Sequence, residues 1–120
     1  MKDLEDIKHR VRQFAEARDW DQFHSPKNLT MAMSVEVGEL MEHFQWLTEQ
    51  QSATPDAKTK AAIIDEIADI QVYLVRLADK LGVDILQAVE QKMQKNEAKY
   101  PADKVKGSAK KYTEYHKDKK

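Results

Sequence analysis

Two short segments of the chain each carry a pair of acidic residues three positions apart, Glu36-x-x-Glu39 and Glu66-x-x-Asp69. On a helix, residues with this spacing point from the same face, so the carboxylates of a pair can converge on one small volume. Carboxylate oxygens without an accompanying imidazole suit Mg²⁺ or Mn²⁺. The two pairs therefore predict a metal site whose ligands are Glu36, Glu39, Glu66 and Asp69.

A single Glu-x-x-Glu pair is more often a solvated surface face than a site. The second pair favours a site, because Glu66 and Asp69 lie in a run of apolar residues where uncompensated carboxylates are costly to bury. A bound cation would offset that cost. Gly38 removes a side chain beside the first pair, where either a neighbouring helix or a phosphate can approach.

The rest of the sequence excludes several other phosphohydrolase chemistries. The chain has no cysteine, so zinc-thiolate sites and thiol nucleophiles are absent. None of the four histidines is followed by aspartate, and no P-loop run is present. Attack by water at the metal site is the simplest remaining chemistry, and either Glu36 or Glu39 would orient or deprotonate that water.

The elements that must position these residues are expected to be helices. Three glycines and three prolines are few for a chain rich in β-turns. Apolar residues recur at helical spacing and predict four helices, over about residues 3–19, 29–50, 56–81 and 84–99. Asn28 is the expected N-cap of the second helix, Gly82 ends the third, and Tyr100-Pro101 ends the fourth.

The third predicted helix is apolar around most of its circumference between Ile63 and Leu81, so it must be covered on all sides. Four helices of one chain provide too thin a core for this. We therefore predict an all-α, four-helix-bundle-type fold in which the bundles are completed between subunits of a homo-oligomer.

Charge is distributed unevenly along the chain. Residues 101–120 hold seven lysines and three acidic residues, whereas the whole chain has a net charge of −1. We expect a helical catalytic domain over residues 1–100 and a lysine-rich tail over 101–120, either solvated or folded as a flap over an anionic substrate. The acidic body disfavours nucleic-acid binding. No membrane span or secretory signal is evident, so we expect a cytoplasmic protein.

The spacing of the acidic pairs, with 26 residues between them, resembles the metal signature of the MazG-like all-α nucleoside triphosphate pyrophosphohydrolases. Other segments resemble the dCTP pyrophosphatase branch in the same order: Arg18 to Leu29, Phe44-Gln45-Trp46, Lys92-Met93-x-x-Asn96, Tyr100-Pro101, and Lys106 to Thr113. The resemblance implies Mg²⁺-dependent hydrolysis of dCTP or a modified dCTP to monophosphate and pyrophosphate, as nucleotide-pool sanitation. It also implies a homotetramer, a dimer of dimers.

The resemblance also assigns roles to individual residues. The four carboxylates match magnesium ligands, and Trp20 and Trp46 match aromatic residues near the base. Lys92, Asn96 and Tyr100 match family positions that reach the substrate from a neighbouring subunit. Lys92, Lys110 and Lys111 are candidate phosphate contacts. Val11 stands where the dCTP enzymes carry a histidine, which predicts a wider range of bases.

Other interpretations of the same residues remain open on the sequence. Trp20 can simply anchor its loop on the core, and Trp46 can lie in a subunit interface. The chain as a whole can be a non-catalytic helical interaction module, which predicts no stabilisation by metal. A carboxylate bundle that binds or oxidises iron is a further alternative, but such bundles carry Glu-x-x-His motifs that this chain lacks.

Overall fold

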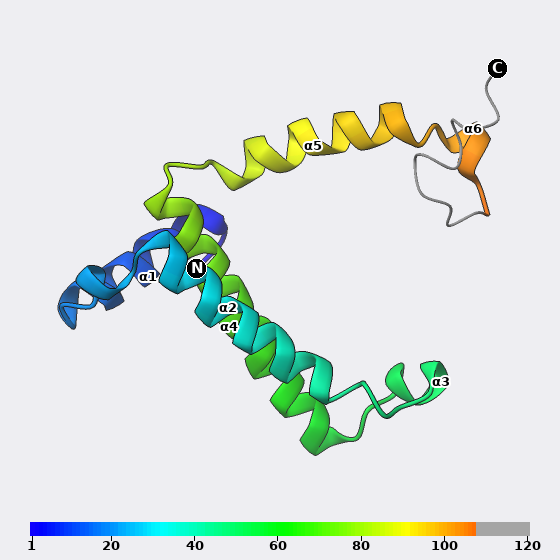
Figure 1. The fold of residues 1–120 in the computed structure, drawn as a ribbon, viewed down its shortest axis with the longest axis horizontal. Coiled ribbons are helices and arrows are strands. Elements are labelled where there is room, and N and C mark those ends of the chain that lie inside the picture. The colour runs from blue at the N-terminus through cyan, green and yellow to red at the C-terminus, as the bar shows by residue number, and fades with distance from the viewer. Residues whose placement is uncertain (108–120) are drawn as a thin grey trace. The chain divides into compact units, whose positions relative to one another are not determined.

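The structure is a computed structural model that describes residues 1–107. This range contains six α-helices and one short 3₁₀ helix, and it contains no strand (Figure 1). The predicted all-α fold class is therefore confirmed. The chain divides into two compact units, one over residues 1–83 and the other from residue 84 onward.

The first unit is built on two long antiparallel helices. Its elements are α1 (Leu4–Ala17), η1 (Asp21–Phe23), α2 (Pro26–Glu42), α3 (Glu49–Ser52) and α4 (Ala57–Lys80). Both α2 and α1 pack against α4 (Figure 1). The small core contains the buried apolar residues Ala15, Leu29, Ile63, Val75 and Ala78.

Local sequence signals explain where these helices begin and end. The side chains of Asp3, Ser25 and Asp56 each accept a hydrogen bond from the backbone N–H three residues later, which caps α1, α2 and α4. At the other end of α4, Gly82 adopts a φ of 66°. Its left-handed conformation lets the Val83 N–H donate to the Ala78 carbonyl at 2.8 Å, as in a Schellman motif.

The predicted limits of the second helix are wrong at both ends. Ser25 caps α2 with proline at the first helical position, so Asn28 lies inside the first turn and its side-chain amide donates to the Phe23 carbonyl. The helix ends at Glu42 rather than at Gln50. Residues 43–46 form turns, and Thr48 then begins α3 through a capping box with Gln51.

The second unit contains α5 (Ile85–Lys99) and α6 (Ala102–Val105). Asp84 caps α5 by accepting a hydrogen bond from the Gln87 N–H at 3.0 Å, so the fourth predicted helix is confirmed. Part of the predicted tail, residues 102–105, forms a short helix. The remainder of that tail, with Lys110 and Lys111, lies outside the described residues.

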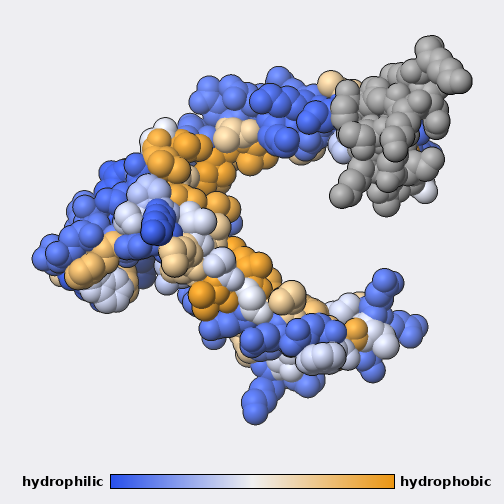
Figure 2. Space-filling view, viewed as in Figure 1, coloured by the Kyte–Doolittle hydropathy of each residue, from blue (hydrophilic) through white to orange (hydrophobic). Residues whose placement is uncertain are grey.

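The long helices of the first unit leave much apolar surface exposed. Met31 and Val35 on α2 are each 58% exposed, and Ile64 and Ile67 on α4 are exposed to a similar degree. Figure 2 shows apolar side chains gathered over α2 and α4. Within the described residues, no helix is both long and apolar enough to cross a membrane.

Candidate metal and nucleotide site

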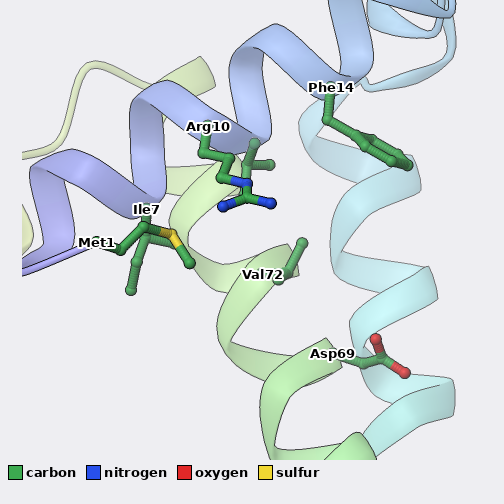
Figure 3. Close-up of a pocket in the computed structure, with 7 residues that line it drawn as sticks. Met1, Ile7, Arg10, Phe14, Asp69 and Val72 are labelled. Carbon is green, nitrogen blue, oxygen red and sulfur yellow. The ribbon is translucent and has the colours of Figure 1, made fainter.

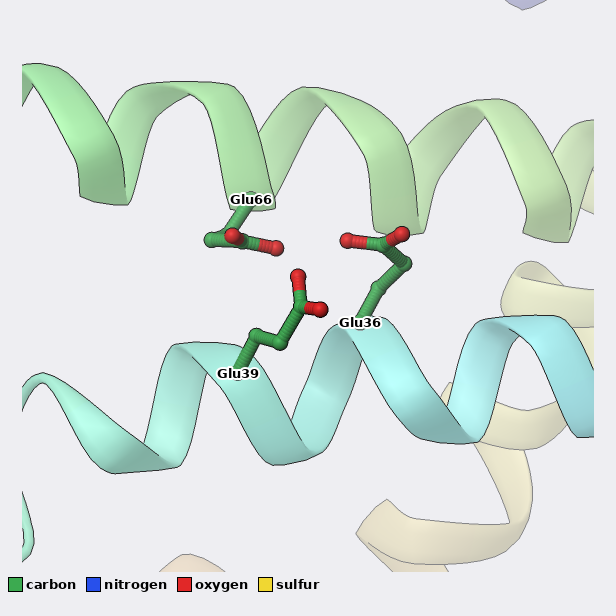
Figure 4. Close-up of side chains that lie close together, drawn as sticks. All are labelled: Glu36, Glu39 and Glu66. Carbon is green, nitrogen blue, oxygen red and sulfur yellow. The ribbon is translucent and has the colours of Figure 1, made fainter.

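Three carboxylates from the two antiparallel helices meet at one place. Glu36 and Glu39 project from consecutive turns of α2, and Glu66 projects from the facing side of α4 (Figure 4). Each offers one carboxylate oxygen, and these oxygens lie within 4.8 Å of one another. The i, i+3 spacing on α2 and the side-by-side packing of α2 and α4 together produce this convergence.

The electrostatics of this cluster favour a positive charge among the three carboxylates. The Glu66 carboxylate, burial and the Glu39 carboxylate together raise the pKa of Glu36 from 4.5 to about 7. The Oε2 atom of Glu66 is buried and has no hydrogen-bond partner among the described residues. A buried acceptor without a donor is costly, and a divalent cation with hard-ligand preference would satisfy it. The residues present therefore fit such a cation.

Asp69, the fourth expected ligand, lies outside this cluster. It follows Glu66 by one turn of α4 and is exposed. Its side chain lines a pocket of about 430 Å³ between α1 and α4, together with Val11, Phe14 and Val72 (Figure 3). The structure thus brings three of the four predicted carboxylates together and places the fourth beside an apolar pocket.

A second, smaller pocket of about 140 Å³ also includes Asp69 and Val11, and Trp20 forms part of its wall. The Trp20 ring meets Phe14 edge to face, with a centroid separation of 5.6 Å and an interplanar angle of 73°. Trp20 is nevertheless 44% exposed. Part of a flat apolar surface therefore faces solvent at a pocket that also includes Asp69, as stacking with a base requires.

Gly38 leaves open space beside the cluster. A Cβ atom built at this position would meet no heavy atom within 4 Å. Of the two sequence-based explanations, packing against a helix of the same chain therefore finds no support in the described residues. Approach by a ligand or by another subunit remains the prediction.

The other predicted substrate residues lie in the turn after α2 and in the second unit. Trp46, in the turn after α2, is 87% exposed. Lys92 and Asn96 lie one turn apart on α5, and Tyr100 follows that helix and donates its backbone N–H to the Asn96 carbonyl at 2.8 Å. Because these three residues belong to the second unit, their roles in substrate binding stay predictions.

A group of charged residues near the second pocket was not foreseen from the sequence. Arg76 on α4 is only 3% exposed, and its guanidinium contacts Asp21 at 2.7 Å and Asp79 at 3.3 Å. Its Nε donates to His24 Nδ1 at 3.2 Å. Arg12 of α1 pairs with Asp79 as well, with its Nε at 3.0 Å. The only sequence signal was an arginine in an otherwise apolar stretch of helix.

Comparison with known proteins identifies the class to which this fold and site belong. The MazG-like family model matches residues 31–115, which include all the cluster carboxylates, and the chain belongs to the MazG-like family. Among individual relatives, it is 46% identical over 114 residues to dCTP pyrophosphatase 1 of Mus musculus and 44% identical over 113 residues to that of Homo sapiens. Each comparison covers 92% of this chain and 66% of the relative's length.

A solved structure supports the same class. The crystal structure of a pyrophosphatase from Archaeoglobus fulgidus superimposes on the chain with a TM-score of 0.77 and 39% sequence identity. The superposition covers 81% of this chain and 91% of that one. The predicted family and the MazG-like all-α fold are therefore confirmed.

Proposed function

We propose that the chain hydrolyses (deoxy)nucleoside triphosphates to the monophosphate and pyrophosphate, with dCTP or a modified dCTP as the preferred substrate. The observation that carries this proposal is the three-carboxylate cluster, in which a buried Glu66 oxygen has no partner within the described residues. The dCTP pyrophosphatase name of its mouse and human relatives supports the substrate class. The chain spans about two thirds of the length of those relatives.

Glu36, Glu39 and Glu66 would hold Mg²⁺, and Asp69 would join them from the next turn of α4. Magnesium, when bound, supplies neutralisation of the triphosphate charge. Either Glu36 or Glu39 would orient or deprotonate the attacking water. Trp20 offers its exposed face to the base.

The remaining contacts are assigned by resemblance and by chemistry. Trp46 is an exposed aromatic surface for the base, and Asn96 carries both a donor and an acceptor that complement the polar edge of cytosine. Lys92, Lys110 and Lys111 would contact phosphates, and Tyr100 would contact the substrate from a neighbouring subunit. Val11, without a polar group, leaves room for bases other than cytosine.

The proposed active form is a homo-oligomer, a tetramer built as a dimer of dimers. Large apolar side chains with more than a third of their surface exposed include Met31, Val35, Ile64 and Ile67 on the two long helices. A monomer rarely exposes a contiguous apolar surface of this kind, and a second copy of the same helices is a complementary cover.

The proposal is tested with the full chain, Mg²⁺ and a panel of the common ribo- and deoxyribonucleoside triphosphates. We expect monophosphate and pyrophosphate in equal amounts, the largest kcat/KM for dCTP, and loss of turnover when EDTA is present. Release of orthophosphate with a nucleoside diphosphate would contradict the assigned bond cleavage. No turnover of any triphosphate would contradict the proposed activity as a whole.

A further inference from the structure

The segment between α1 and α2 carries Trp20 and makes three polar side-chain contacts with α4. Asp21 accepts from the Arg76 guanidinium at 2.7 Å and from Lys80 Nζ at 2.6 Å, both through Oδ1. His24 accepts from Arg76 Nε at 3.2 Å. One side chain of α4, Arg76, therefore contacts residues at both ends of the segment that follows Trp20.

The backbone places Trp20 directly before this segment. Asp19 ends α1 in the left-handed conformation, with φ 54°, and the Trp20 N–H donates to the Ala15 carbonyl at 2.9 Å. The Trp20 carbonyl in turn accepts from the Phe23 N–H at 2.9 Å. Movement of the segment over residues 21–24 would therefore change the position of the Trp20 ring.

Stability alone does not explain an arginine at position 76. Its side chain is 4% exposed, and Val75 and Ala78 beside it are buried. Replacing a buried ion pair by apolar side chains of similar volume is often neutral or stabilising. Moreover, each acid has a second cationic partner, because Arg12 also pairs with Asp79 and Lys80 with Asp21. His24 differs from the two acids, because among the described residues the hydrogen bond to its Nδ1 comes from Arg76.

We infer that Arg76 is a positioning residue, which fixes the Asp21–His24 segment on α4 and thereby holds the Trp20 ring at the pocket that also contains Asp69. Arg76, His24 and Trp20 all line that pocket of about 140 Å³. This inference rests on the proposed function in taking Trp20 as the surface on which the base stacks. His24 accepts through Nδ1, so its ring is neutral, and burial followed by the charge of Arg76 lowers the pKa of His24.

The test compares Arg76→Met and Arg76→Lys with Lys80→Met as a matched control. Methionine keeps a long apolar side chain but makes none of the three polar contacts. Lysine can pair with one acid but cannot also donate to His24 from a planar fork. Lys80→Met removes the other cation from Asp21 and leaves every Arg76 contact in place.

The first measurement is acrylamide quenching of Trp20 fluorescence in a Trp46→Phe background, where Trp20 is the only tryptophan. We expect Arg76→Met to raise the quenching constant, Arg76→Lys to raise it less, and Lys80→Met to leave it unchanged. An unchanged constant in Arg76→Met, or an equal rise in Lys80→Met, would overturn the inference.

The second measurement is steady-state turnover of dCTP with Mg²⁺, using variants that retain Trp46. We expect Arg76→Met to raise KM about tenfold with kcat within about twofold of wild type, and Arg76→Lys to recover part of the loss. A fall in kcat without change in KM would contradict positioning. If Arg76→Met does not fold, Arg76→Lys against Lys80→Met decides the question. If wild type turns over no triphosphate, the proposed function fails while the quenching comparison still tests the position of Trp20.

Discussion

Replacing Glu36 by glutamine tests the electrostatics of the carboxylate cluster directly. In the folded chain without a bound cation, the Glu66 carboxylate, burial and the Glu39 carboxylate raise the pKa of Glu36 from 4.5 to about 7. A group whose pKa is higher in the folded state binds more protons there than in the unfolded state. The contribution of Glu36 to the free energy of unfolding therefore falls as the pH rises from 4.5 to about 7.

The size of this effect follows from the pKa shift. At about 1.4 kcal/mol per pKa unit, the shift corresponds to at most about 3.5 kcal/mol. Because Glu36 is partly exposed, screening by solvent reduces this to about 1 to 2 kcal/mol. Glu36→Gln removes the charge, so it should raise the free energy of unfolding at about pH 8 by this same amount. For a chain of this length, that increase raises Tm by about 4 to 10 °C.

The assay is thermal unfolding in EDTA at about pH 5 and about pH 8, with the protein concentration held constant because an oligomer unfolds in a concentration-dependent way. Between the two pH values wild type should lose stability relative to Glu36→Gln, and the lowered pKa of His24, which acts in the opposite direction, is common to both proteins. Glu42→Gln is the matched control, because Glu42 is exposed at the end of the same helix and outside the cluster. Added Mg²⁺ should stabilise wild type more than Glu36→Gln.

The reasoning is refuted if wild-type stability does not fall relative to that of Glu36→Gln between these pH values in EDTA. It is also refuted if Glu36→Gln and Glu42→Gln have the same effect at the higher pH. Either result would mean that the three carboxylates do not repel one another in the folded protein. The cluster would then be a solvated surface, as a single Glu-x-x-Glu pair usually is.

Glu39→Gln and Asp69→Asn should each lower kcat at least about a hundredfold while circular dichroism stays unchanged, and retained activity would remove that carboxylate from the site. Light scattering at micromolar concentration should give a tetrameric mass, or at least a dimeric one, and a monomer would contradict bundles completed between subunits. Asn96→Ala should reduce the preference for dCTP over other triphosphates about ten- to a hundredfold in kcat/KM. A purine triphosphate preferred by wild type would contradict the cytosine assignment.

The sequence predicts those parts of the fold that depend on short-range patterns. Apolar spacing locates the long helices, and the i, i+3 spacing of Glu36 and Glu39 places both on one face of α2. The end of α2 is different, because Phe44 and Leu47 continue the apolar period past Glu42. The capping box that begins at Thr48 competes with that pattern, and an apolar period alone does not reveal which of them prevails.

The position of Asp69 depends on how two helices meet rather than on either helix alone. A pair at i and i+3 shares a face, but only the carboxylates at the level of the partner's acids can join a common cluster. The relative register of α2 and α4 places Glu66 opposite Glu36 and Glu39, and Asp69 is not among the carboxylates that converge there. That register is set by packing along the whole interface, which spacing within one segment does not specify.

Arg76 shows the same limit for a residue whose partners are distant in sequence. Next to Val75 and Ala78, a lone arginine would be expected to place its charge in solvent, yet it is buried. Burial is tolerable because Asp21 and His24 come from the turn after α1, more than 50 residues earlier in the chain. Pairing the guanidinium therefore requires the turn to lie against α4. The interaction that makes the charge acceptable also fixes the segment next to Trp20, which accounts for a costly buried arginine beside the proposed nucleotide site.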